Sequence, residues 1–344
     1  MPEQTSGAKL AAVTTTPTHP TSAPTDLRGF DNLKRQKIAA LLVLICQAGI
    51  VFTGSIVRVT GSGLGCTTWP NCQPGSLTPV QGAAPAIHQA IEWGNRLLTF
   101  VVGAAALYCF IVVWRAGRRR AIKVFAFLQG IGVIVQAIIG GISVLLSLKW
   151  WIVALHFMPS MILVWMAALL YEWIKQPDTG RPVQFFPRPL QYLALAAAVA
   201  LLIVLTTGTM VTGAGEHAGD YEAGALGRLH VDLAEIAHIH AHFMYLYLGL
   251  TVGLVVALLA IRANKQTLRL GLILIVFILA QAAIGIIQYN WGVPRWTVPF
   301  HVGLCGVIVA YMGFLYAQGR QLVDPTMEDT PALPLGVETA AAPR

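Results

Sequence analysis

Eight apolar segments, each about twenty residues or longer, dominate this chain of 344 residues. A helix that rises 1.5 Å per residue needs about 20 apolar residues to cross about 30 Å of hydrocarbon. Because backbone polar groups in lipid must be satisfied within their own segment, each segment predicts a membrane-spanning helix. The expected spans are residues 37–57, 91–114, 123–146, 151–174, 190–211, 236–261, 268–288 and 297–318.

Composition and charge agree with this reading. Hydrophobic residues make up 56% of the chain and charged residues 11%, which leaves too little polar surface for a soluble globule. Lys and Arg gather in alternate loops and before the first span, which predicts a multi-pass protein of the cell (plasma) membrane with both termini cytoplasmic. The net charge of +8 then reflects basic loops facing anionic lipid, and no nucleic acid is expected as a partner.

The chain also repeats itself. Residues 136–140 read Gln-Ala-Ile-Ile-Gly and residues 281–285 read Gln-Ala-Ala-Ile-Gly, 145 positions later. The same offset takes His156 to His301 and Asn95 to His240. A register kept through three separate apolar segments predicts a duplication.

Four spans in each half give both halves the same orientation, related by a pseudo-twofold axis along the membrane normal. We therefore expect an all-α integral membrane protein with eight transmembrane helices in two pseudo-twofold-related four-helix bundles. The expected parts are a disordered cytoplasmic tail (1–30), an N-terminal bundle (31–176) with an outer cysteine loop (61–90), a cytoplasmic linker (177–188), a C-terminal bundle (189–320) and a second disordered cytoplasmic tail (321–344).

Polar residues of the spans gather near the outer leaflet. Asn95, His156, His240 and His301 all fall in the first turns of spans that enter from the outer side. Two imidazoles from facing helices can supply both axial ligands of a haem iron, and intramembrane ionisable groups are usually functional. We expect His240 and His301 to be such ligands, whereas the alternative is that each histidine hydrogen-bonds to a neighbouring helix.

Two further histidines, His238 and His242, flank His240 on other faces of the same span. Only the register of the repeat selects the middle residue of the three. His240 is therefore the expected ligand, and its two neighbours are the next candidates.

Glu92 lies three residues before Asn95 and so on the same helical face. Its repeat partner is Ala237, which means that the carboxylate is present in one copy of the site only. A partly buried carboxylate could shuttle a proton or stabilise a developing cation, and Glu92 is the expected catalytic residue. The alternative is an interfacial Glu paired with Arg96 or with a cation of the loop.

Cys66 and Cys72 lie in the outer loop with five residues between them, one of which is Pro70. The outer compartment is oxidising, so we expect a disulfide. A metal site is less favoured because no His or further Cys accompanies the pair at ligand spacing. The cysteines within the spans are expected to be small apolar core residues: Cys46, Cys109 and Cys305.

Together these features resemble the haem A synthase family. The most specific stretches are residues 54–66, Gly-Ser-Ile-Val-Arg-Val-Thr-Gly-Ser-Gly-Leu-Gly-Cys, and residues 209–220, Thr-Met-Val-Thr-Gly-Ala-Gly-Glu-His-Ala-Gly-Asp. The Glu-led second span, the two Gln-x-x-Ile-Gly segments and the aligned His on spans four, six and eight add to them. The resemblance runs through residues 37–318 and leaves out both tails.

The resemblance implies an oxidoreductase that converts haem O to haem A for cytochrome c oxidase. It implies a haem b cofactor ligated by His240 and His301, and a substrate haem O in the N-terminal half beside Glu92, with His156 and Asn95 at its iron. The C8 methyl would be oxidised to a formyl with water as the oxygen source. The outer cysteine pair would form a disulfide, as its position already suggests.

One departure from the family concerns the second span. The family pattern is Glu-x-x-His-Arg, whereas this chain has Asn95 between Glu92 and Arg96 in place of the histidine. A carboxamide is a poor iron ligand, so either His156 holds the substrate iron alone or another residue completes the site. His88, seven residues before Asn95 on the same face, is one such residue.

Other expectations concern partners. Protohaem farnesyltransferase is a donor of haem O by pathway order alone, while the electron acceptor stays open and a homo-oligomer remains an option. Arg58 and Arg228 are the first choices among the outer-side cations for haem propionates. Two other function classes remain, a dihaem membrane electron-transfer cytochrome and a duplicated transporter, although the asymmetry of the sites argues against the first and the absence of midplane polar clusters against the second.

Overall fold

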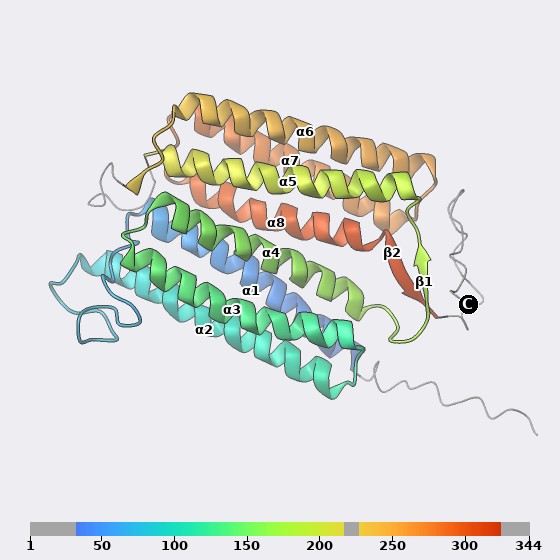
Figure 1. Cartoon of the computed structure of the whole chain (residues 1–344), viewed down its shortest axis with the longest axis horizontal. Helices are drawn as coiled ribbons and strands as arrows, with labels where there is room; N and C mark the ends of the chain where they lie inside the picture. Colours follow the sequence, from blue (N-terminus) through green and yellow to red (C-terminus); the bar gives the residue numbers. More distant parts are fainter. Residues whose placement is uncertain (1–31, 217–226, 325–344) are drawn as a thin grey trace, which may run out of the picture.

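The computed structural model describes residues 32–216 and 227–324, and most of the two expected tails lies outside these residues. Within them, eight helices run side by side along the molecule (Figure 1), all long and apolar enough to cross a membrane. The eight predicted spans are therefore confirmed. The helices are α1 (Leu33–Val59), α2 (Ala86–Arg115), α3 (Arg120–Leu145), α4 (Trp150–Ile174), α5 (Arg188–Ala214), α6 (Leu233–Ala260), α7 (Lys265–Asn290) and α8 (Thr297–Ala317).

Local sequence explains where several helices begin. The side chain of Asp232 accepts a hydrogen bond from the backbone of Glu235 at the start of α6, and Asn264 accepts one from Thr267 at the start of α7, both at 2.8 Å. Such caps satisfy backbone N–H groups that a first helical turn leaves unpaired. Helix α2 begins directly after Pro85, so the last residues of the expected loop 61–90 are helical instead.

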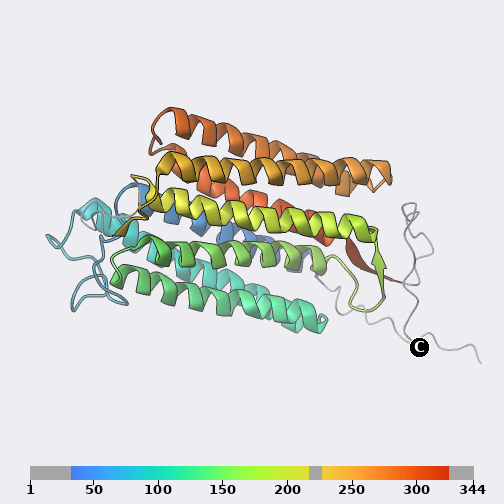
Figure 2. The ribbon, with the colours of Figure 1, turned by 45° about the horizontal axis from the view of Figure 1, so that its top comes forward.

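The helices form two bundles in the order of the repeat. In the first, α1 packs on α2 and α4, and α3 packs between α2 and α4. In the second, α5 packs on α6, α6 on α7 and α7 on α8, while α5 and α8 touch over a short length only. Helices α4 and α8 meet at the centre of the molecule with α1 and α5 beside them (Figures 1 and 2), an approximate twofold arrangement in which α1 and α4 pack more closely than their counterparts α5 and α8.

Glycines on α8 bring the two halves together. Gly306 lies against Ala48 of α1, and Gly313 lies against Ala168 of α4, where an added Cβ would be 3.0 Å from the Ala168 methyl. Helices in lipid gain little from burying apolar surface against each other, so their attraction depends on close van der Waals contact between small residues. The interface between the halves is therefore set by the absence of side chains on α8.

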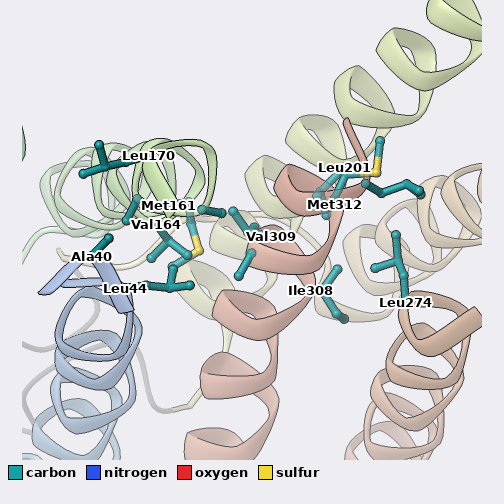
Figure 3. Close-up of a cluster of buried hydrophobic side chains, with 14 of the residues drawn as sticks. Ala40, Leu44, Met161, Val164, Leu170, Leu201, Leu274, Ile308, Val309 and Met312 are labelled. Carbon is teal, nitrogen blue, oxygen red and sulfur yellow. The ribbon is translucent and has the colours of Figure 1, made fainter. Parts of the chain in front are cut away.

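Larger apolar side chains fill the space around this contact (Figure 3). They come from both halves and form one continuous core rather than one core for each bundle. The residues labelled in Figure 3 are Ala40, Leu44, Met161, Val164, Leu170, Leu201, Leu274, Ile308, Val309 and Met312.

A small sheet closes the molecule at the end opposite the cysteine loop (Figure 1). Strand β1 (Arg181–Gln184), from the linker between the halves, pairs antiparallel with β2 (Arg320–Val323), which follows α8. Residues 321–323, which the sequence assigns to the C-terminal tail, are thus part of an ordered sheet. We call this end of the molecule the sheet end and the opposite end, with residues 60–85, the loop end.

Beside the sheet, Arg118 is fully buried and holds three segments together. It donates hydrogen bonds to Asp178 of the linker at 2.9 Å, to Gln36 of α1 at 2.7 Å and to the carbonyl of Gln176 at 2.7 Å. A buried guanidinium needs this number of acceptors to offset its lost hydration. The turn between α2 and α3 is thereby fixed to the segment that leaves α4 and leads into the linker.

Replacing Gly313 with leucine tests the contact between the halves. Gly313→Leu is expected to lower the free energy of unfolding by about 1–3 kcal/mol, because the new side chain overfills a closed interface. Thermal unfolding of the detergent-solubilised protein measures this. Gly249→Leu on α6, where an added Cβ meets nothing within 4 Å, is the matched control and should change stability little; equal effects of both substitutions would contradict the prediction.

Candidate functional site

The structure brings the four expected ligand positions to the loop end. Asn95, His156, His240 and His301 lie within the first three turns of α2, α4, α6 and α8, and all four helices begin at that end. The sequence prediction that these residues share one level of the molecule is therefore consistent with the fold.

Two glutamines hold equivalent histidines in the same way. Gln136 of α3 donates a hydrogen bond to the carbonyl of His156 at 2.8 Å, and Gln281 of α7 donates one to the carbonyl of His301 at 2.9 Å. Each glutamine also bonds the side chain one turn further along, Ser160 in the first half and Cys305 in the second. The repeat found in the sequence is thus a repeat of contacts.

Glycines leave room for the imidazole rings. An added Cβ on Gly140 of α3 would lie 3.2 Å from Cε1 of His156, and one on Gly285 of α7 would lie 3.5 Å from Cε1 of His301. Gly208 of α5 plays this part for His240, at 3.1 Å. Each ring therefore lies against bare helix backbone, which fixes its position by close packing.

The hydrogen bonds of His240 determine which nitrogen is available. Its Nδ1 lies 3.1 Å from the carbonyl oxygen of Val204 and 3.1 Å from the hydroxyl of Thr207. A carbonyl only accepts, so Nδ1 carries the proton and Nε2 keeps its lone pair. This is the tautomer that a metal-ligating histidine adopts when its other nitrogen donates to a backbone carbonyl. His238 and His242 are exposed, in agreement with the choice of His240 from the repeat.

His156 and His301 each have a buried ring nitrogen, Nδ1. Among the residues that the structure describes, Nδ1 of both histidines has no hydrogen-bond partner. Buried polar atoms are normally satisfied, so equivalent unpaired nitrogens in both halves indicate sites shaped for a bound group.

Asn95 has a different environment from His240, its repeat partner. The hydroxyl of Thr53 on α1 donates to Oδ1 of Asn95 at 2.7 Å. His88 lies in the first turn of α2, two turns before Asn95, and its side chain is half-buried. The first half therefore has one histidine seated like a ligand and one engaged carboxamide.

Glu92 is buried and paired. One carboxylate oxygen accepts the backbone N–H of Cys66 at 2.6 Å, and the other accepts Nη2 of Arg96 at 2.6 Å. The pairing with Arg96 that the sequence suggests as an alternative is therefore present. Both contacts favour the ionised carboxylate, because each places a donor against it.

Arg96 extends this contact to the cysteine loop. Its guanidinium donates to the carbonyls of Cys66 at 3.2 Å, Thr68 at 2.9 Å and Asn71 at 3.0 Å. Cys66 and Cys72 form the predicted disulfide. The loop is thus fixed to α2 through Arg96, a role that the sequence spacing does not reveal.

The same loop also covers part of α3. The indole of Trp69 lies directly over Gly141, so that a side chain at this position would overlap the ring. Gly141 is the neighbour of Gly140, which seats His156. The loop and the histidine are therefore held by adjacent residues of one helix.

The two candidate propionate partners lie at the loop end. Arg58 donates to the carbonyl of Thr212 at 3.2 Å and so joins α1 to α5, while Arg228 is exposed and donates to the carbonyl of Glu216 at 3.1 Å. In the described residues no group of three or more His, Cys, Asp or Glu side chains could hold a metal ion. Axial ligation of a haem would need two imidazoles only, fewer groups than such a cluster.

Fold and site together define a class of protein, an all-α membrane protein built from two repeated bundles that each seat histidine near one end. The chain belongs to the cytochrome oxidase assembly protein family (COX15-CtaA), whose model matches residues 37–312.

Parts of the chain are similar to proteins named heme A synthase. The one from Lysinibacillus sphaericus is 32% identical over 168 residues, covering 47% of this chain and 53% of that protein. The one from Exiguobacterium sp. is 34% identical over 171 residues, covering 48% and 54%. The one from Bacillus licheniformis is 28% identical over 182 residues, covering 52% and 59%. The chain thus spans about half the length of the curated relatives it matches.

Removing the guanidinium of Arg96 should release the cysteine loop. Arg96→Leu leaves Glu92 without its cation and three carbonyls without their donor, so we expect loop amides near Cys66 to exchange on the order of a hundredfold faster. Hydrogen exchange followed by mass spectrometry measures this. Arg96→Lys keeps the charge but not the planar fork and should be intermediate; unchanged exchange in both variants would show that the disulfide alone orders the loop.

Proposed function

We propose that this protein is a haem A synthase, which oxidises the C8 methyl of haem O to a formyl group and so supplies haem A to cytochrome c oxidase. The observation that carries the proposal is a duplicated histidine site in which a buried carboxylate, Glu92, accompanies one copy only. Family membership and the names of the relatives point to the same activity.

The C-terminal half is the place for a resident haem b. His240 presents Nε2 with its lone pair, and Gln281 and Gly285 fix the backbone and ring of His301. His240 and His301 would hold the haem iron through their two imidazoles, and the haem would supply electron transfer rather than substrate binding. The residues present therefore fit this cofactor.

The N-terminal half is the place for haem O as substrate, near His156, Asn95 and Glu92. Methyl oxidation with water as the oxygen source releases protons and electrons, and an external acceptor must take the electrons. Glu92, held ionised by Arg96 and by the Cys66 N–H, stabilises positive charge that develops on the substrate. The cysteine loop excludes bulk water from this end of the bundle.

We place the protein in the plasma membrane. In the proposed orientation, the sheet end faces the cytoplasm. The basic residues before α1 and between α2 and α3 favour it. Haem O made by protohaem farnesyltransferase would enter from the membrane, with its propionates towards Arg58 and Arg228 at the loop end.

Expression in a host that makes haem O but no haem A tests the proposed reaction. Extracted haems are separated by chromatography, and the expected result is haem A in cells that carry the protein and none in cells that do not. A protein that binds haem yet yields no haem A would instead be an electron-transfer cytochrome. A protein without any haem spectrum would leave the transporter reading.

Alanine at either proposed haem b ligand should abolish the low-spin haem. His240→Ala and His301→Ala each remove one of two axial nitrogens, so the low-spin b-type spectrum is expected to be lost in both. Absorption and electron paramagnetic resonance spectra of the purified protein measure this. His238→Ala and His242→Ala are matched controls on the same helix, and an unaltered low-spin signal in the His240 or His301 variant would refute the assignment.

Loss of the charge on Glu92 should reduce the reaction while leaving haem bound. Glu92→Gln keeps the size of the side chain, so haem A formation is expected to fall on the order of a hundredfold with haem b and haem O retained. Glu235→Gln, at an exposed position in the first turn of α6, is the control. Near-normal haem A would remove the chemical role of Glu92, and loss of all bound haem would assign it to folding of the loop.

A further inference from the structure

We infer that the site in the N-terminal half holds its iron through one protein ligand, His156, and leaves the opposite face open to a small exogenous ligand beside the carboxamide of Asn95. This inference rests on the proposed function in two respects, that a haem occupies this half and that His240 and His301 ligate a haem in the other. It assigns to the protein a second kind of site, one for diatomic or other small iron ligands.

One side of the site, around His156, has the same surroundings as its counterpart around His301 in the other half. His156 matches His301 in three features: a glutamine bonded to its backbone carbonyl, a glycine close to its Cε1 and a buried Nδ1 without a described partner. What this scaffold does for an imidazole ligand in one half, it does in the other. His156 is thus a ligand by equivalence within this chain.

The other side of the site differs between the halves in its residue type. Asn95 stands where the repeat has His240, and it has no imidazole lone pair to offer. Its Oδ1 accepts the Thr53 hydroxyl at 2.7 Å, so the carboxamide oxygen is already engaged with α1. The amide NH₂ that remains is a donor only. Asn95 is therefore suited to hydrogen-bond to something on the iron rather than to bind the iron.

His88 does not replace the missing imidazole at position 95. His88 precedes Asn95 by seven residues on α2, which corresponds to about 10 Å along the helix axis. An imidazole about 10 Å from the level of Asn95 along the helix axis is too far away to bind an iron held by His156. Its stretch of α2 is also fixed, since Gly65 of the loop lies against the His88 carbonyl with no room for a side chain.

The two halves should then hold iron in different states. A haem with two imidazoles is six-coordinate and does not bind carbon monoxide readily, whereas a haem with one imidazole is five-coordinate and high-spin. An N–H donor next to the open position stabilises partial negative charge on a bound ligand. Carbon monoxide is the probe for this difference because it binds ferrous iron and reports on neighbouring donors through its stretching frequency.

The experiment uses the full-length protein purified from a host that makes haem O. Its haem content is measured first, and two haems per chain are expected. After reduction, carbon monoxide should bind to one of the two haems, with the low-spin signal of the other unchanged. A wild-type protein that holds two haems and remains fully low-spin without binding carbon monoxide would overturn the inference.

Reciprocal substitutions give the sharper result. Asn95→His should close the first site, so that carbon monoxide binding is lost and a second low-spin signal appears. His240→Asn should do the reverse and create a second haem that binds carbon monoxide. If Asn95→His retains both haems and still binds carbon monoxide at the wild-type level, the position does not face the iron and the inference fails.

A third variant tests the open side of the iron and the hydrogen-bond donor of Asn95 separately. Asn95→Leu removes the NH₂ group but adds no ligand, so carbon monoxide should still bind while its stretching frequency rises. An unchanged frequency would remove Asn95 as the donor. The proposed function fails in a distinguishable way, since a protein with two haems of the expected spin states that makes no haem A keeps this inference and loses the function. A protein that makes haem A but holds two low-spin haems that bind no carbon monoxide keeps the function and loses this inference.

Discussion

Close approach of helices at glycine is the constraint on which the rest of this structure depends. Gly306 and Gly313 let α8 contact the first half. At Gly140, Gly208 and Gly285 the missing side chain lets a histidine ring pack directly against helix backbone. In a hydrocarbon solvent, helices attract each other mainly through contacts at short range, so a missing side chain has more effect than an added apolar one. The same device joins the halves and positions their polar residues.

The duplication separates what is scaffold from what is chemistry. Residues that position the rings, Gln136 and Gln281 among them, make the same contacts in both halves. Residues that decide reactivity differ: Asn95 stands opposite His240 in the repeat, and Glu92 opposite Ala237. A protein with two copies of a site can change one of them while the other keeps the original ligand set. The asymmetry therefore carries more functional information than the resemblance between the halves.

The sequence predicts the helices and the register of the ligand positions because both are periodic along one segment. It favours His240 over its two neighbouring histidines as the expected ligand, since an offset kept through three segments is not a local ambiguity. It does not predict how Arg96 binds Thr68 and Asn71, because a loop of irregular backbone offers its carbonyls without a pattern in the residues. It also misses β2, whose few residues acquire their order from β1, a segment far away in the chain. Contacts between unlike segments are the part that local pattern leaves out.

The pairing of β1 with β2 also has a mechanical consequence. Strand β1 belongs to the only covalent connection between the halves, and β2 returns from the far end of the second half to lie against it. The two bundles are consequently joined at the sheet end in two ways, through the peptide chain of the linker and through the hydrogen bonds between β1 and β2. The halves also touch at the loop end, where Arg58 of α1 donates to the carbonyl of Thr212 of α5 and Gly213 of α5 lies against Trp150 of α4. The halves are therefore held together at both ends, which restrains the two bundles from moving apart at either of them.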